Sequence, residues 1–250
     1  MSRHVLIVGN APIEERVAGL VDGADHVVRF NKTRGFGGAS GSRTDELWLI
    51  NHGGQMAEWL ARDTLTALPA VAFARTIVLP VPMLPGHLSA VQARRRERDR
   101  CESIDPDRVN HLAEAQRRLE KEGRTVTRVT AGEYGAAQRA LAALSGASGP
   151  HHPSSGFIAI HRTLARAGSA EYVTLCGFTF EGWRGHSWDA ERRWVLERER
   201  EGRVTVRRAA ARSTRAETIS TRRAGSPPIG ISRAHGKIGR RLDRAGNDVW

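Results

Sequence analysis

Residues 5–10 read VLIVGN, and this stretch is the clearest indication of the fold in the sequence. Four aliphatic residues in a row, without polar alternation, are typical of a strand buried on both faces of a parallel sheet. The run stops at Gly9-Asn10, a turn of the kind that leads from such a strand into a helix. A polar, helix-compatible segment follows at about 13–20, so the stretch predicts the first strand and helix of an α/β domain.

The same pattern recurs along the chain, since further short apolar runs end in Gly, Asn or Pro. The expected strands cover residues 5–8, 26–30, 46–50, 76–79, 125–129, 172–176 and 203–206. Between them we expect a charged helical flank at 88–123, a helix from Ser154 or Ser155 to about Ala167, and a charged helix at 189–201. The fold class is therefore α/β, Rossmann-like, with a mostly parallel central sheet and helices on both faces.

A chain of 250 residues is long enough for one α/β domain of ordinary size. Its apolar stretches stay below the roughly 18 residues of a spanning helix, and its N-terminus runs directly into a strand. We therefore expect a cytoplasmic protein without a transmembrane segment. Cys101 and Cys176 lie far apart, without His or Cys at metal-ligand spacing, so neither a zinc site nor a disulfide framework is expected.

The formal net charge of +12 is concentrated near the C-terminus, where residues 203–250 hold eleven Arg and one Lys against three acidic residues. This composition predicts two parts, an α/β domain at 1–202 and a basic, weakly ordered tail at 203–250. The tail is either a solubilising segment or an arm for weak, salt-sensitive contact with nucleic acid or an anionic surface. It lacks interleaved aromatic residues for base stacking.

Small polar residues mark the predicted strand ends and one helix start. In open α/β sheets, ligands bind in the crevice at the carboxyl ends of the strands. Glycine lets backbone N–H groups approach a phosphate, an Asn amide donates without adding charge, and a helix N-terminus attracts anions. Ordinary turns and an ordinary N-cap are the alternatives. The candidate nucleotide-binding residues are Gly9, Asn10, Asn31, Ser154, Ser155 and Gly156.

Basic residues near these strand ends are candidate partners for an anion. The segment at 35–44 is rich in Gly, Ser, Thr and Arg, which either makes a simple turn between two strands or contributes to a nucleotide pocket. Arg29, Arg34, Arg43 and Arg184 could each pair with a phosphate or carboxylate, or lie on the surface as ordinary charges.

His186 and Glu191 are the catalytic candidates. A neutral imidazole accepts a proton near neutral pH, and a nearby carboxylate could orient it. The alternative is a histidine that merely packs or lies exposed. The pair Asp105 and Asp107, separated by Pro106, falls in the charged helical flank and not at a strand end. We interpret it as a helix-start turn and not as a metal-binding motif.

Taken together, the motifs resemble those of the sialyltransferases, glycosyltransferase family 29. The large motif is matched by residues 5–10, 28–31, 35–36 and 40–44, and the small motif by 153–156 with the strand ending at 175–178. The very short motif, a His followed five positions later by a Glu, is matched by His186 and Glu191. The resemblance spans residues 5 to about 195.

The resemblance implies a GT-A-like variant of the α/β fold and an inverting, metal-independent transfer from a CMP-sugar donor to a glycan acceptor, without a cofactor. The donor sugar would be sialic acid or a related acid such as Kdo. Asn10 and Asn31 would contact the phosphate and ribose side of the nucleotide. Ser154, Ser155 and Gly156 would hold the nucleotide, and His186 would be the general base.

The chain also departs from the animal enzymes of that family. The positions of their motif-linking disulfide are matched by Val5 and about Ala170. We expect neither the Golgi anchor nor the stem of those enzymes. The chain is more similar to short bacterial members, some labelled urease operon accessory protein. An inactive nucleotide-binding or accessory protein that retains the fold is therefore the alternative function.

Overall fold

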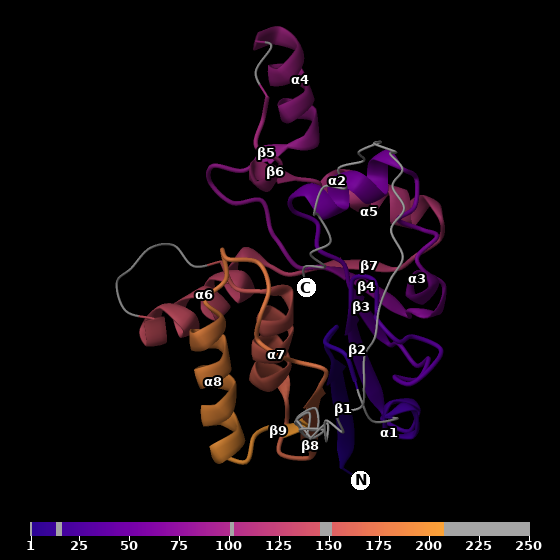
Figure 1. Ribbon diagram of the computed structural model, residues 1–250, viewed down its shortest axis with the longest axis vertical. Helices are drawn as coiled ribbons and strands as arrows, with labels where there is room; N and C mark the ends of the chain where they lie inside the picture. The colour runs from indigo at the N-terminus through magenta and orange to yellow at the C-terminus, as the bar shows by residue number, and fades with distance from the viewer. Residues whose placement is uncertain (1, 14–16, 101–102, 146–151, 208–250) are drawn as a thin grey trace, which may run out of the picture.

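A parallel sheet of seven strands forms the centre of the molecule, in the order β7-β4-β3-β2-β1-β8-β9 (Figure 1). The computed structural model describes residues 2–13, 17–100, 103–145 and 152–207. The strands are β1 (Arg3–Val8), β2 (His26–Phe30), β3 (Glu46–Trp48), β4 (Thr76–Leu79), β7 (Val126–Arg128), β8 (Glu171–Cys176) and β9 (Thr205–Arg207). Every neighbouring pair is parallel, which confirms the predicted α/β, Rossmann-like class.

Helices cover both faces of this sheet. On one face α6 (Ala131–Ser145), α7 (Ser155–Arg166) and α8 (Trp188–Arg200) lie together, as Figure 1 shows. The other face is covered by α1 (Ala18–Asp22), α2 (Gly54–Ala61), α3 (Pro69–Phe73) and α5 (Leu112–Lys121). Alternate residues of β1 serve the two faces, because Val5 and Ile7 belong to one buried cluster whereas Leu6 and Val8 belong to another. The run of aliphatic residues is therefore explained by burial on both sides.

The strand order reverses at β1, because β2 lies on one side of β1 and β8 on the other. The chain moves from β1 through β2, β3 and β4 to β7, and then returns to place β8 and β9 on the other side of β1. In open α/β sheets a crevice forms at such a switch point, beyond the carboxyl ends of the strands. Here the crevice lies beside Asn10, directly after β1.

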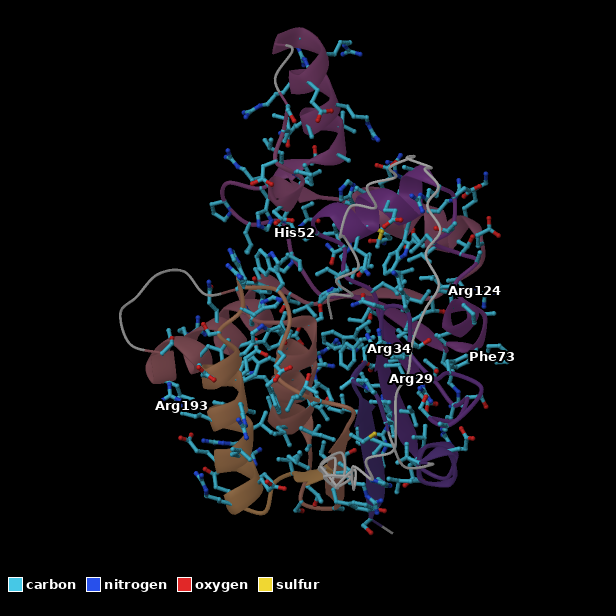
Figure 2. The ribbon with its side chains drawn as sticks, viewed as in Figure 1. Arg29, Arg34, His52, Phe73, Arg124 and Arg193 are labelled. Carbon is cyan, nitrogen blue, oxygen red and sulfur yellow. The ribbon has the colours of Figure 1, made fainter. Side chains whose placement is uncertain are left out.

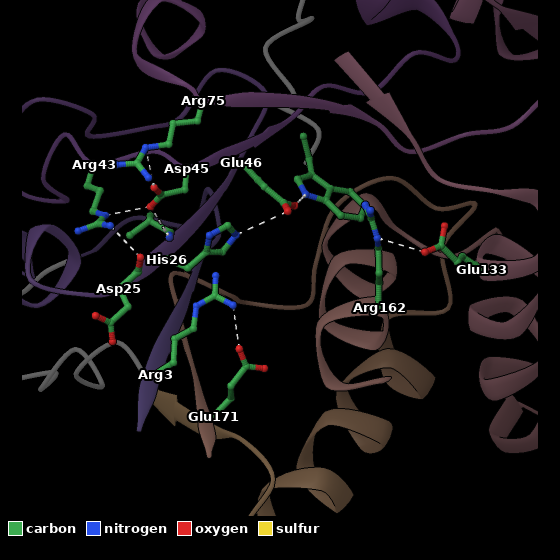
Figure 3. A network of polar contacts seen from close by, with 12 residues as sticks. Arg3, Asp25, His26, Arg43, Asp45, Glu46, Arg75, Glu133, Arg162 and Glu171 are labelled. Atoms are coloured by element: carbon green, nitrogen blue, oxygen red, sulfur yellow. Dashed lines mark hydrogen bonds and ion pairs between the residues drawn. The ribbon is translucent and has the colours of Figure 1, made fainter. Parts of the chain in front are cut away.

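Charged residues gather at the opposite, amino ends of the strands (Figure 3). Arg3 of β1 pairs with Glu171 of β8 at 2.8 Å, and His26 of β2 lies 3.6 Å from Glu46 of β3. Asp45, just before β3, pairs with Arg43 at 2.9 Å. This network occupies the edge of the sheet away from the crevice.

An arm formed by residues 88–110 projects from the body (Figure 1). It consists of β5 (Leu88–Ser89), α4 (Ala90–Arg100), the 3-10 turn η1 (Pro106–Arg108) and β6 (Val109–Asn110). Helices α4 and α5 lie within 88–123, which confirms that this flank is helical. The short pairing of β5 with β6 was not part of the prediction. The Asp105 side chain accepts a hydrogen bond from the Asp107 N–H, which confirms the predicted helix-start turn.

Two buried asparagines fix the base of this arm. The Asn51 side chain donates to the Asn110 side-chain oxygen at 3.0 Å, and it exchanges two hydrogen bonds with the backbone of Val81. Asn110 donates in turn to the carbonyl of Pro82 at 3.1 Å. The arm is therefore joined to the end of β4 by a buried amide network and not by the sheet itself.

Several elements differ from the prediction. Helices α2, α3 and α6 were not predicted, and β3 ends at Trp48, two residues early. Strand β9, close to the strand expected at 203–206, pairs with β8, so the sheet extends to Arg207. Residues 208–250 of the expected basic tail, with Cys101, lie outside the described residues. Among the helices that are described, none is both long and apolar enough to cross a membrane.

Candidate functional site

Two adjoining cavities form the crevice at the carboxyl ends of the strands. The first, here called the strand-end cavity, has a volume of about 320 Å³ and is lined by Asn10, Asn31, Lys32, Arg34 and Gln55 among others. The second, the histidine cavity, has a volume of about 200 Å³ and is lined by His52, Gln55, Tyr134, His152, Trp183 and His186 among others. Gln55 lines both cavities, so a ligand of nucleotide-sugar size could span them.

Asn10 and Asn31 line the strand-end cavity, as the two strand ends predict. Asn10 donates to the Phe30 carbonyl and accepts from the Arg34 N–H, both at 3.1 Å, so it ties the ends of β1 and β2 to the loop after them. Asn31 has a φ of 48°, a left-handed conformation that Asn adopts more readily than most residues. Its Oδ1 accepts from the Ile50 N–H at 2.9 Å.

The amide nitrogen of Asn31 has no hydrogen-bond partner in the described chain, although the side chain is 1% exposed. The bond from the Ile50 N–H identifies the oxygen end of the amide, so the donor end is the unpaired one. A buried donor without a partner costs about 1–3 kcal/mol. Asn31 is therefore a donor that a ligand oxygen in the strand-end cavity could satisfy.

His186 lies at the edge of the histidine cavity, in the turn before α8. Its Nδ1 lies 2.6 Å from the carbonyl oxygen of His152, an acceptor, so Nδ1 carries the proton and Nε2 is left as the acceptor. Trp183 and Trp188 meet the imidazole edge-on, with ring centroids 5.0 and 4.9 Å away. The ring is therefore held in one orientation and one tautomer.

Burial lowers the pKa of His186 to about 4, although the hydrogen bond to His152 opposes this shift. The imidazole is therefore neutral at pH 7, in the state that accepts a proton. An anionic ligand nearby would raise its pKa again and make it a stronger base. The arrangement suits a general base that takes a proton from a hydroxyl group.

Glu191 does not contact His186 in the described structure; it binds Ser154. The Ser154 N–H and hydroxyl donate to the two carboxylate oxygens of Glu191 at 2.8 and 2.7 Å. Glu191 is 1% exposed, and burial raises its pKa to about 7 against the opposing effect of these two bonds. Since His152 lies two residues before Ser154, Glu191 holds the segment whose carbonyl orients His186.

The Ser154-Ser155-Gly156 motif has three separate roles. Ser154, one of the two serines predicted as the start of this helix, is the N-cap of α7, because its Oγ accepts from the Phe157 N–H at 3.0 Å. Ser155 lines the histidine cavity. Gly156 permits the close approach of Phe178, whose ring would lie 3.0 Å from a Cβ at that position. Ser155 is the member of this motif that the structure places in the crevice wall.

Gly9 faces β8 and not the cavity wall. A Cβ at Gly9 would lie 2.1 Å from the Gly177 carbonyl oxygen, and the Ala11 N–H donates to that oxygen at 3.0 Å. The glycine is explained by close packing of the two strand ends. This packing also places Asn10 directly at the crevice.

The arginine candidates divide into two groups. Arg29 is buried under the 35–44 loop and donates to the carbonyl oxygens of Gly41 and Arg43, both at 2.9 Å, while Arg43 pairs with Asp45 at the amino edge. These two side chains are therefore unavailable to a ligand in the crevice. Arg34, labelled with Arg29 in Figure 2, lines the strand-end cavity, and Arg184 lines a third hollow next to His186.

Sequence reasoning missed much of the wall around His186. Three histidines, His52, His152 and His186, line the histidine cavity, and the ring of His87 lies 4.3 Å from that of His52 between centroids. Figure 2 shows His52 below the base of the arm. Burial, with smaller contributions from His87, His152 and His111, lowers the pKa of His52 to about 4. Within the described residues, no group of three or more His, Cys, Asp or Glu side chains could hold a metal ion.

Fold and cavities together define an α/β protein with a crevice at its topological switch point and, in the wall of that crevice, a neutral histidine held in one orientation. No protein-family model matches the chain. Over 211 residues the chain is 30% identical to the urease operon 23 kDa accessory protein of Rhizobium meliloti (strain 1021). The matched region covers 81% of this chain and 91% of that protein. The chain belongs to the family of this urease operon accessory protein.

Proposed function

We propose that the crevice binds a CMP-sugar and that His186 activates a glycan hydroxyl for transfer of the sugar. The observation that carries this proposal is the 2.6 Å contact between His186 Nδ1 and the His152 carbonyl. It leaves Nε2 as a proton acceptor beside the histidine cavity, which shares Gln55 with the strand-end cavity. The resemblance of the motifs to sialyltransferases supports the nature of the donor, sialic acid or a Kdo-like acid.

In this proposal, Nε2 of His186 takes the proton of the acceptor hydroxyl. The hydroxyl oxygen attacks the anomeric carbon, and the bond from that carbon to the phosphate oxygen breaks with inversion, so that CMP leaves with the bonding electrons. Asn31 donates to the nucleotide, while Lys32 and Arg34 add positive charge to the cavity wall. No step uses a metal ion or a cofactor.

A second function is favoured by the relative's name, which describes an accessory protein of a urease operon. In that case the crevice binds the same nucleotide class without turnover, and the protein acts through binding alone. The same geometry serves both functions, because a neutral histidine can accept a hydrogen bond without accepting a proton. The two functions differ in whether donor is consumed.

Release of CMP from CMP-sialic acid and CMP-Kdo, measured by chromatography with simple glycans as acceptors, separates them. We expect the wild-type protein to release CMP and the His186→Ala variant to do so roughly 10²- to 10⁴-fold more slowly while it still binds CMP. His161→Gln is the matched control, because His161 packs against Trp194 outside the crevice. Wild-type protein that binds CMP but consumes neither donor would establish the second function instead.

A further inference from the structure

The N-terminus of α2 opens at the junction of the two cavities. Its cap is Gly53, with a φ of 80°, and its first residue is Gly54, so no side chain within the described chain caps this end of the helix. Gly54 lines the histidine cavity, and Gln55 lines both cavities. The first N–H groups of a helix lack intrahelical partners and, with the helix dipole, attract anions.

An independent observation points to a ligand at the same place. Asn31 lines the strand-end cavity together with Gln55, and its buried amide nitrogen has no partner in the described residues. The Ile50 N–H holds the oxygen end of the amide, so the nitrogen end is the one that remains without a partner among the described residues. An oxygen atom held by the first turn of α2 could therefore also accept from Asn31.

A carboxylate of the arm already lies beside this helix end. Gly53 approaches Asp107 so closely that a Cβ at Gly53 would lie 3.0 Å from Asp107 Oδ1. Asp107 also lines the histidine cavity. Its negative charge is favourable next to the N-terminus of α2, but it would repel a second anion bound there.

We propose that the N-terminus of α2, with the Asn31 amide, binds the phosphate group of the nucleotide, and that Asp107 competes with it. This assignment rests on the proposed function, because it places the phosphate of the same ligand. It assigns the Gly53-Gly54-Gln55 turn to the site, which neither the strand-end motifs nor the Ser154 helix start indicated. It also couples the arm to ligand binding, since Asp107 belongs to the 3-10 turn of the arm.

Gly54→Pro tests the backbone donor directly. Proline is tolerated as the first residue of a helix, and it removes the N–H at that position. Gly54→Ala is the matched control, because it keeps the N–H and its Cβ would meet nothing within 4 Å. In titration calorimetry with CMP and with cytidine, we expect Gly54→Pro to bind CMP about five- to tenfold more weakly than Gly54→Ala does, and the two variants to bind cytidine alike.

Asp107→Asn tests the competing carboxylate without depending on the helix. We expect it to strengthen CMP binding several-fold, whereas Asp99→Asn, the same charge change on the exposed part of the arm, should leave it unchanged. Equal CMP binding by Gly54→Pro and Gly54→Ala, together with wild-type-like binding by Asp107→Asn, would overturn the assignment of the phosphate to α2 while leaving the proposed function intact. Failure of the wild-type protein to bind CMP would overturn both.

Discussion

Gly9 and Gly177 set how closely the ends of β1 and β8 approach each other. The approach is between backbone atoms, because a Cβ at Gly9 would lie 2.1 Å from the Gly177 carbonyl oxygen and no side-chain rotation can relieve that contact. The crevice depends on this packing, since Asn10 follows Gly9 directly. At the scale of single residues, the glycine that ends the first strand is thus a packing residue next to the site.

Gly9→Ala should therefore destabilise the whole domain by about 2–3 kcal/mol, because the two strand ends must separate. Gly19→Ala is the control: a Cβ at Gly19 in α1 meets nothing within 4 Å, and replacing a helical glycine stabilises by up to about 1 kcal/mol. Urea denaturation measures both changes in the free energy of unfolding. Equal stability of the two variants would show that β1 and β8 do not meet as described.

Loop 35–43 is the element that a single buried side chain holds in place. Arg29 is 1% exposed and donates to the backbone carbonyls of Ser40, Gly41 and Arg43. Burial lowers its pKa to about 10, so the guanidinium remains charged at neutral pH. The sequence predicted a Gly-rich loop between two strands, but it could not show that the nearest Arg faces this loop and not a ligand.

Arg29→Met should destabilise the protein by about 2–4 kcal/mol, since it leaves several buried carbonyl groups without a donor. It should also make the loop at 35–43 a new site of limited proteolysis. Arg75→Met is the control, because the Arg75 side chain is 77% exposed and its pair with Asp45 should contribute less than about 1 kcal/mol. Unchanged proteolysis of the Arg29 variant would contradict the role of this side chain.

Elements with a strong local sequence pattern could be predicted, and elements without one could not. Strands β1 and β4 carry continuous apolar runs, and β2 and β8 are mostly apolar with one buried polar residue each, Arg29 and Thr174, so local sequence alone indicated them. Helix α6 reads AGEYGAAQRALAALS, and its small residues give little amphipathic contrast to detect. The sequence narrows the N-cap of α7 to Ser154 or Ser155, because that role depends on a local backbone contact, and the structure assigns it to Ser154.

The wall of the site was harder to predict for a physical reason. His52, His152 and His186 come from three distant segments, and they meet only because parallel strands end at the same edge. The spacing of His186 and Glu191 suggested a direct pair, whereas the structure joins them through the segment from His152 to Ser154. No signal within either motif indicates that a backbone carbonyl lies between them.

At the scale of the whole molecule, buried titratable groups make stability depend on pH in opposing directions. The pKa of Glu191 is raised from 4.5 to about 7, so the folded protein holds a proton there between these values and the unfolded chain does not. Its contribution to stability is therefore complete below pH 4.5 and is lost as the pH rises through 7. His52 and His186, lowered from 6.5 to about 4, contribute above pH 6.5 and lose this contribution as the pH falls toward 4.

Comparison of Glu191→Gln with the wild type isolates the first of these effects. The variant has no carboxyl that titrates at this position. As the pH rises from 4.5 to 8, its free energy of unfolding should therefore increase relative to that of the wild type by up to about 3 kcal/mol. Urea denaturation at pH 4.5, 6 and 8 measures this shift. A difference that stays constant over this range would mean that the Glu191 carboxyl titrates alike in the folded and unfolded chain.

Titration calorimetry of the full chain with CMP, in buffer containing a chelator, tests whether the crevice at the ends of β1 and β2 binds a cytidine nucleotide. Asn31→Asp is the matched variant, because it keeps the oxygen that accepts from the Ile50 N–H and replaces the unpaired donor with a second oxygen. We predict micromolar binding by the wild-type protein and at least a tenfold loss in the variant. Absence of binding by the wild type would show that the crevice is not a cytidine nucleotide site, and equal binding by the variant would show that the Asn31 amide does not hold the nucleotide.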